Sequence, residues 1–414
     1  MRSQITLATL RTSVVLGARL LVQSGTLLII ARLLGPNEYG AFAGITSLAV
    51  ILGTLSTFGT HIVLLAEVSR NPFNRVQILP FAITTTLLCS CILLGIYILI
   101  TLLISTESNI SFGVKFSIGV SELLILPLIT IPSAEHQGHG RIARSQLLMT
   151  FPLILRFIVA IVVWLVGSES PLPQYAYGYL CASVFALFVA TRSLRDTWPP
   201  LSSWRLPTKG ELQNTAGYAL LNITAVGPTE LDKTLAPRVL TATTAGIYSA
   251  GARIIGALTL PVIALMLSAM PKLFRDNHAN VRRTGKFLIV LVGASLGYSV
   301  ILDIALWLTA PMFDQLFGPQ YTGMHYAIRW LCVAVPGMSL RITLGSILMS
   351  LRHPWLRAAF EFVGLVTLCI AALTLAPRYD LVGMALALAA SEWSMAIIGA
   401  LALVVIHQRR SGLI

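Results

Sequence analysis

Long apolar runs separated by short polar breaks make up most of this chain. A membrane-spanning α-helix needs ~20 largely apolar residues, and runs of that length recur along the whole sequence. They are too continuous for the alternating pattern of an outer-membrane β-barrel. The pattern therefore predicts an all-α polytopic membrane protein with twelve transmembrane helices, near residues 12–34, 41–65, 79–104, 113–133, 147–166, 174–191, 214–235, 244–268, 286–309, 321–349, 356–376 and 381–405.

The composition fits a bilayer rather than water. Hydrophobic residues make up 56% of the chain and charged residues only 11%, so too few polar residues are present to cover a water-facing surface. The first apolar run contains Arg19, exceeds twenty residues and has no small-x-small cleavage site. We therefore expect it to stay in the protein as the first helix rather than be removed as a signal peptide.

Lysine and arginine are unevenly divided between the two sides of the predicted helices. Of the 29 basic residues, nineteen lie in the breaks on the amino-terminal side and four in the opposite breaks. Because basic loops stay in the cytoplasm, both termini are predicted to be cytoplasmic. The net charge of +13 then reflects topology and attraction to anionic membrane lipids, and it gives no reason to expect a nucleic-acid partner.

Two polar breaks about half the chain apart have a similar form, "LLGPNEYGAF" at 33–42 and "VLTATTAGIY" at 239–248. Two copies that enter the membrane from the same side predict a parallel repeat, which is a common transporter architecture with the substrate path between the halves. The expected parts are an N-terminal six-helix lobe (1–191), a cytoplasmic linker (192–213) and a C-terminal six-helix lobe (214–414). A shift of 206 positions aligns Arg32 with Arg238, Leu34 with Leu240, Gly40 with Gly246 and Phe42 with Tyr248.

Four stretches carry a family resemblance: "ARLLGPNEYGAF" at 31–42, "LLAEVSRNP" at 64–72, "ELDKTLAPRVLTATTAGIYSAGARI" at 230–254 and "LFGPQYTGMHYAIRWL" at 316–331. Through them the chain resembles the polysaccharide transporter family, the O-antigen-type flippases of the multidrug/oligosaccharidyl-lipid/polysaccharide (MOP) superfamily. The resemblance implies a bacterial inner-membrane protein with two six-helix lobes, similar in fold to multidrug-extrusion (MATE) transporters.

The resemblance also implies a function and partners. A family member moves a lipid-linked oligosaccharide, carried on undecaprenyl diphosphate, from the cytoplasmic to the periplasmic leaflet by alternating access. This step belongs to the biosynthesis of lipopolysaccharide O-antigen or exopolysaccharide, with the polysaccharide polymerase and export machinery as further partners. The alternative within the superfamily is a multidrug or cation antiporter. A membrane glycan polymerase or ligase fits less well, because the outer breaks are too short for a catalytic loop, so we expect a transporter and no enzyme.

Arginines inside the predicted helices suit an anionic substrate, since a guanidinium binds phosphate oxygens in bidentate fashion. Arg19 and Gln23 share one polar face of the first helix, and Arg19 either lines a cavity or reaches to the headgroups. Arg253 is the second candidate, and its alternative is an ion pair with Glu122 or Glu392. Arg341 lies deep in the tenth helix. The expected substrate-binding residues are Arg19, Gln23, Arg253 and Arg341.

Acidic residues inside the predicted helices have two interpretations. A lone buried carboxylate is a natural proton site, whereas a carboxylate beside an arginine is a structural ion pair. Arg156 on the fifth helix is expected to pair with Glu122 on the fourth under the second interpretation. The candidates for ion coupling or ion pairing are Glu122, Asp232, Glu361, Glu392 and Arg156.

Other chemistry is not expected. Glu135, His136 and His139 are close in sequence but no further ligand set is evident, so neither a metal site nor a cofactor is predicted. The five cysteines lie in apolar runs and indicate packing rather than disulfides. GxxxG motifs at Gly40 and Gly44 and at Gly293 and Gly297 predict close approach of helices at both places.

Overall fold

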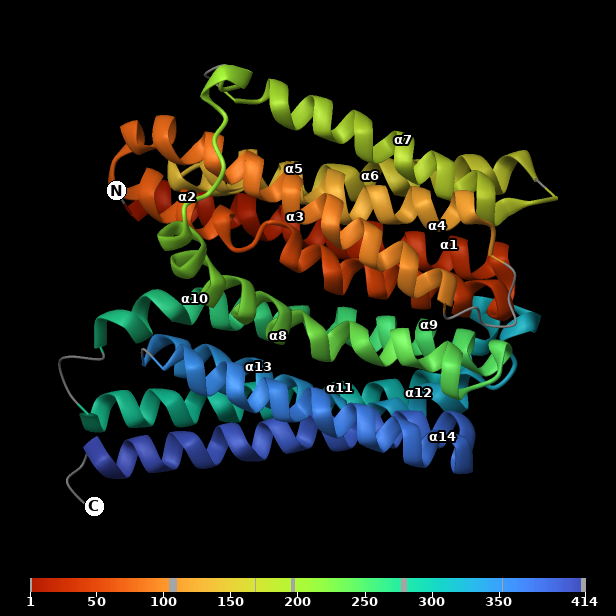
Figure 1. Cartoon of the computed structure of the whole chain (residues 1–414). Helices are drawn as coiled ribbons and strands as arrows, with labels where there is room; N and C mark the ends of the chain where they lie inside the picture. Colours follow the sequence, from red (N-terminus) through yellow and green to blue (C-terminus); the bar gives the residue numbers. More distant parts are fainter. Residues whose placement is uncertain are drawn as a thin grey trace. The chain divides into compact units, whose positions relative to one another are not determined.

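The computed structural model describes residues 2–103, 110–167, 169–194, 198–276, 281–351 and 353–410 (Figure 1). These residues are almost entirely helical and contain no β-strand, so the predicted all-α class is confirmed. The chain forms two compact units. The first comprises Met1–Leu34 and Ala41–Val226, and the second comprises Gly35–Gly40 and Gly227–Ile414.

The first unit begins with the long helix α1 and ends within α8. Its elements are α1 (Arg2–Ser56), α2 (Thr60–Arg70), the short 3₁₀ helix η1 (Pro72–Asn74), α3 (Arg75–Leu103), α4 (Phe112–Gly119), the π-helical turn η2 (Val120–Ile125), α5 (Leu126–Gly138), α6 (Ile142–Val166), α7 (Pro171–Arg192), the 3₁₀ helix η3 (Leu201–Ser203) and the first part of α8 (Lys209–Val239).

The second unit contains the rest of α8 and the helices that follow it. They are α9 (Ala242–Leu258), α10 (Leu260–Asp276), α11 (Val281–Phe317), the 3₁₀ helix η4 (Pro319–Tyr321), α12 (Met324–Cys332), α13 (Val335–Ser350) and α14 (Pro354–Arg410). Helices α12 and α13 meet at a bend of 43° and together are long enough for one broken span.

Helix α14 contains two of the predicted spans, and α1 contains the first span and most of the second, which continues into α2. Helix α1 breaks at Gly35 (φ 67, ψ 170), inside the polar stretch that the sequence marks as a turn, because glycine tolerates a positive φ and Pro36 follows it. Helix α14 breaks at Asp380 (φ 49, ψ −129). Eight helices of the described residues are long and apolar enough to cross a membrane, or nine with the bent pair. Dividing α1 and α14 at their breaks and adding the more polar α8 accounts for the twelve predicted spans.

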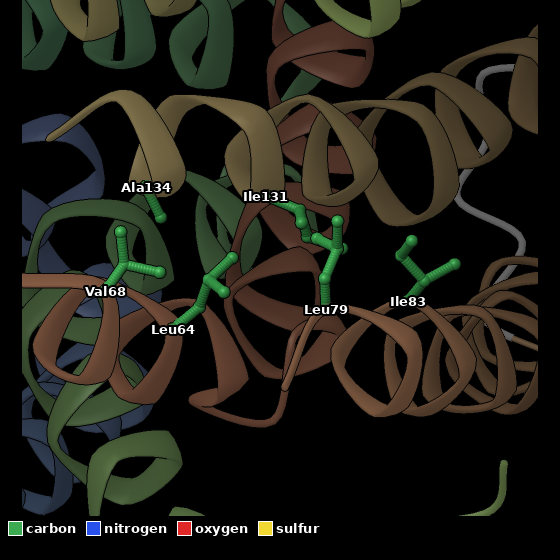
Figure 2. Packing of buried hydrophobic residues seen from close by; sticks show 6 residues of the cluster. All are labelled: Leu64, Val68, Leu79, Ile83, Ile131 and Ala134. Carbon is green, nitrogen blue, oxygen red and sulfur yellow. The ribbon is translucent and has the colours of Figure 1, made fainter. Parts of the chain in front are cut away.

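A core of aliphatic side chains holds α2, α3 and α5 together in the first unit. Figure 2 shows side chains of α2 and α3 directed toward α5; the cluster consists of Leu64, Val68, Leu79, Ile83, Ile131 and Ala134. Trp198 and Trp204, from the segment before α8, pack against the same cluster. This segment is therefore anchored on the first unit by apolar contacts.

A capping box begins α8. The backbone N–H of Thr208 donates to Glu211 Oε2 (2.9 Å), and the backbone N–H of Glu211 donates to Thr208 Oγ1 (3.3 Å). Arg205 donates to both oxygens of the Glu211 carboxylate, at 2.8 and 2.5 Å. The Arg205 hydrogen bonds lower the pKa of Glu211 to about 2, so this helix start keeps its charge pair at neutral pH.

Equivalent positions of the two repeated breaks meet inside the second unit. Thr243 Oγ1 donates a hydrogen bond of 2.5 Å to Asn37 Oδ1, across the same separation of 206 positions that aligns the two breaks. A Cβ on Gly246 would lie 1.9 Å from the Pro36 carbonyl oxygen, so only glycine permits this approach.

The GxxxG prediction at α11 is wrong. A Cβ added to Gly293 or Gly297 would meet nothing within 4 Å among the described atoms, so these glycines do not mediate a close helix contact here. The motif marks a small-residue face, but it does not determine whether another helix covers that face.

Candidate functional site

Arg19 and Gln23 lie one turn apart on α1 of the first unit, and both are partly exposed. Neither forms a hydrogen bond or ion pair with any residue that the structure describes. Arg19 is sixteen residues before the break at Gly35, about 24 Å along the helix axis at 1.5 Å per residue. Thr26, the next polar residue of this face, donates to the Val22 carbonyl (2.7 Å). Within the described part of the chain, the polar groups of Arg19 and Gln23 are therefore available to a ligand.

Arg253 lies on α9 in the second unit and is partly buried. Its charge and that of Glu230 both act on the phenol of Tyr39, which is fully buried in the same unit. The two acids considered as its alternative partners are engaged elsewhere, Glu122 with Arg156 and Glu392 with Arg341. The Arg253 guanidinium thus belongs to a buried polar group of the second unit that includes Tyr39 and Glu230.

An acidic group on α8 is neutralised by its own lysine. Lys233 Nζ lies 3.0 Å from Asp232 Oδ1 and 4.0 Å from Glu230 Oε2, and it also donates to the Thr229 carbonyl oxygen. Tyr248 of α9 donates from its hydroxyl to Asp232 Oδ2 (3.0 Å). The lysine ammonium occupies the position that a bound cation would need beside Asp232.

Glu122 and Arg156 form a buried ion pair in the first unit. Arg156 Nη1 lies 3.1 Å from Glu122 Oε1, and each side chain is 7% exposed. Tyr179 donates from its hydroxyl to Glu122, while its ring lies 3.6 Å below the Arg156 guanidinium carbon. Arg156 Nη2 also donates to Ser183 Oγ (3.1 Å). Glu122 is therefore compensated by partners from α6 and α7, and Arg156 by partners from η2 and α7.

The π-helical turn η2 positions Glu122 in this network. A π turn adds one residue to the helical winding and so rotates the side chains that follow. A Cβ on Gly53 of α1 would lie 2.7 Å from the Glu122 carbonyl oxygen, so glycine allows α1 to pass close to this turn.

Arg341 forms a corresponding pair in the second unit. Arg341 Nε donates to Glu392 Oε2 of α14 at 2.6 Å, and both side chains are buried. Glu361 pairs with Arg357 one turn before it on α14, at 2.9 Å. Because Arg341 is engaged inside the unit, we leave it out of the substrate site proposed below.

Some charged groups of the described residues were not predicted as site residues. Arg75 of α3 donates to Glu135 of α5 (2.7 Å), and Asp314 of α11 pairs with His325 of α12 (2.6 Å). Asp303 lies in the middle of α11 without such a partner. Its sequence signal is an acid in an apolar run whose positions three and four residues away are Ser299, Val300, Leu306 and Trp307.

The histidines near the end of α5 have protein partners. His136 Nε2 shares a hydrogen bond with Ser193 Oγ (3.1 Å), and His139 Nδ1 shares one with the Glu135 carbonyl oxygen (2.9 Å). Among the described residues no three His, Cys, Asp or Glu side chains lie together in a metal-binding arrangement.

An all-α membrane fold with charged pairs inside its spans is typical of transporters. A family model described as "Polysaccharide biosynthesis protein" matches residues 9–275, and the chain belongs to this family. No curated protein matches the sequence.

Solved structures show the same fold. A multidrug resistance MATE family transporter of the MOP superfamily, in an inward-facing conformation, matches with a TM-score of 0.75, 15% identity and coverage of 95% of this chain and 94% of that one. The lipid II flippase MurJ matches with a TM-score of 0.72, 11% identity and coverage of 95% and 87%. A MOP superfamily transporter from Pyrococcus furiosus, described as having a binding pocket of reverse polarity, matches with a TM-score of 0.68, 14% identity and coverage of 97% and 95%. The chain therefore has the multi-pass helical fold of these three transporters.

Proposed function

We propose that this protein is a flippase for a lipid-linked oligosaccharide carried on a polyprenyl diphosphate. The observation that carries the proposal is the pair of Arg19 and Gln23, whose polar groups are partly exposed on a membrane helix and bind no described residue. An unpaired guanidinium inside a span is costly unless an anion or water compensates it. The family description of polysaccharide biosynthesis and the name of the lipid II flippase support a lipid-linked glycan as that anion.

In the proposed mechanism two lobes, residues 1–191 and 214–414, alternate in access about a central cationic site. Arg19 and Arg253 hold the diphosphate, the sugars lie in the aqueous part of the path and the prenyl chain stays in lipid. The protein works in the bacterial inner membrane with cytoplasmic termini, supplies O-antigen or exopolysaccharide assembly, and leaves the substrate chemically unchanged. A polymerase and export machinery receive the product.

The structure gives a reason to prefer this function over a cation antiporter. Such an antiporter needs free carboxylates to hold its substrate, but each of the four acids singled out from the sequence has a basic partner. Those residues are Glu122, Asp232, Glu361 and Glu392. Their negative charges are compensated within the protein, whereas no described residue compensates the positive charge of Arg19.

Reconstitution of the purified full chain separates the two functions. Proteoliposomes would contain an undecaprenyl-diphosphate-linked glycan with a fluorescent group on its sugar, and dithionite outside would bleach only the outer-leaflet molecules. We expect the protein to make nearly all of the label accessible, while protein-free vesicles keep their inner-leaflet share. Uptake of ethidium without movement of the labelled lipid would instead identify a cation antiporter.

The proposed orientation predicts the reactivity of single cysteines in a background without the five native ones. Cysteines at Asn37 and Thr243, both exposed side chains, should react with an impermeant thiol reagent added to intact cells, because their breaks face the periplasm. A cysteine at Ser203 should stay unreacted until the cells are permeabilised. The opposite pattern would reverse the orientation and with it the direction of the proposed transport. His278, in the cytoplasmic break after α10, lies outside the described residues and should behave like Ser203.

A further inference from the structure

Asp303 lies at mid-depth in the most lipid-exposed span of the second unit. The span runs from Phe287 to Phe317, so Asp303 is sixteen residues from one end and fourteen from the other. At ~1.5 Å per residue each end is about 20 Å away, whereas half of the hydrocarbon core is ~15 Å thick. The carboxyl therefore lies deep in the membrane, beyond the reach of either aqueous surface.

Asp303 has no counter-ion among the residues that the structure describes. Its Oδ1 atom is buried without a hydrogen-bond partner, and no ion pair or hydrogen bond to either carboxyl oxygen is present within the described ranges. The other acids of the described spans do not share this property. Glu122, Glu361, Glu392 and Asp314 each have a basic partner within 4.0 Å.

Helix α12, which packs against α11, carries polar residues that interact with Asp303 and with later residues of α11. Helix α12 presents His325, Arg329 and Cys332 at spacings of four and three, which lie on one face. His325 pairs with Asp314 of α11. The guanidinium carbon of Arg329 lies 5.3 Å from the centroid of the Trp307 ring. The Cys332 thiol is close enough to Asp303 for the two groups to interact electrostatically. The Arg329 guanidinium is therefore in contact with Trp307, which lies one helical turn after Asp303 on α11.

No charged group on the other neighbours of α11 reaches Asp303 among the side chains that the structure describes. On α13 the only charged residue is Arg341, which Glu392 holds. Helix α13 contacts α11 through a hydrogen bond from Thr343 to Ser295 (2.8 Å) and through Ile342, which packs in the cluster that contains Leu291. Tyr298 of α11 donates to the Leu258 carbonyl at the end of α9 (2.9 Å), and Tyr321 of η4 is fully buried. The charged residues of α10 are Lys272, Arg275 and Asp276, at its cytoplasmic end, and their side chains lie outside the described part of the structure.

We propose that Asp303 is a proton-binding site of this transporter. A bare carboxylate without a partner is strongly disfavoured in hydrocarbon, so the neutral acid is the form that this position holds at rest. Ionisation sends the proton to water and requires that water or the Arg329 guanidinium reach the carboxylate. Asp303 can therefore exchange one proton per conformational cycle, a role that the paired acids cannot take without breaking an ion pair.

Dicyclohexylcarbodiimide tests the proton directly on the purified full chain, without any transport substrate. The reagent partitions into apolar regions and needs the protonated acid: the carboxyl proton moves to a carbodiimide nitrogen as the carboxyl oxygen adds to the central carbon. We expect mass spectrometry to find the adduct at Asp303, with a yield that falls as the pH rises, and no adduct at Glu392. Asp303→Asn should remove the signal.

Arg329→Gln provides the electrostatic control. Without the nearby cation the carboxylate of Asp303 is less favourable than the neutral acid. The pH at which the adduct yield at Asp303 falls should therefore be higher in this variant. A purely structural role of Asp303 predicts no such change. A folded chain that remains unlabelled at Asp303 at low pH, or that is labelled equally at every pH, would overturn the proton site.

The use of this proton in transport rests on the proposed function. In the labelled-lipid vesicles an imposed pH gradient should change the flipping rate of the unmodified protein, and Asp303→Asn should lose that response. A variant that responds like the unmodified protein would refute the coupling. Failure of the unmodified protein to move the lipid at all would refute the proposed substrate while the carbodiimide result stands.

Discussion

Replacing Arg19 with alanine should weaken engagement of the lipid diphosphate by roughly ten- to a hundredfold, and Arg253→Ala should have an effect of similar size. A charge-assisted interaction with a phosphate oxygen contributes ~1.5–3 kcal/mol, and each 1.4 kcal/mol corresponds to about a factor of ten in affinity. Arg19 is available for such an interaction because no described residue binds its guanidinium. The rate of labelled-lipid flipping as a function of lipid concentration measures the loss.

Lysine at the same positions distinguishes a phosphate clamp from a general positive charge. Lysine keeps the charge but lacks the planar fork that binds two oxygens, so the clamp predicts activity between those of the unmodified protein and the alanine variant. If Arg19 only reaches to the headgroups, Arg19→Lys should be fully active, since lysine reaches equally well.

Arg70→Ala is the matched control for these substitutions. Arg70 also belongs to the first unit, but its side chain is 75% exposed and pairs only with Glu67 on the same helix. We expect its loss to leave flipping unchanged. Unimpaired flipping by both Arg19→Ala and Arg253→Ala, at normal membrane abundance, would eliminate the clamp.

The helical architecture was predictable because the bilayer imposes it. Every backbone polar group in hydrocarbon must be satisfied, so an apolar run of sufficient length becomes a helix. The break at Gly35 was equally predictable from the sequence, since Gly-Pro after an apolar run is a local turn signal. The two helices around 214–268 were the weakest prediction, because this stretch is rich in Thr, Gly and Pro. The charges of α8 are compensated within the structure, since Lys233 lies 3.0 Å from Asp232.

Pairing between helices could not be predicted, because it depends on which helices are neighbours. The sequence left Arg156 with two interpretations and Arg253 with two candidate acids. The structure brings α6 beside η2 and α13 beside α14, where Glu122 and Glu392 each pair with an arginine other than Arg253. The π-helical turn that places Glu122 has no signal in local propensity.

Asp303 shows a different limit of prediction from the sequence. Its isolation could have been suspected from the absence of a base one turn away on either side, but a partner on another helix would have been equally consistent with that pattern. Only the described neighbours of α11 show that the available cations lie elsewhere, with Arg341 on Glu392 and Arg329 on Trp307.

Breaking the buried pairs should destabilise the fold far more than breaking an exposed one. Glu122→Gln leaves Arg156, whose side chain is 7% exposed, without its negative partner, and an uncompensated buried charge costs about 3–5 kcal/mol. Glu392→Gln should act similarly on Arg341 in the second unit. We expect lower membrane abundance and a lower thermal unfolding midpoint in detergent for both variants.

Removing both charges should restore much of that loss, because a buried ion pair is often replaceable by apolar groups of similar volume. The double variant Glu122→Gln, Arg156→Met should therefore be more stable than Glu122→Gln alone, whereas Glu67→Gln, in the exposed pair with Arg70, should shift stability by no more than about 1 kcal/mol.

Transport by the double variant then separates the two interpretations of Glu122. If the pair is structural, a stable double variant should still flip the lipid. A double variant that folds normally but no longer transports would show that Glu122 takes part in ion coupling, in addition to Asp303 or in its place.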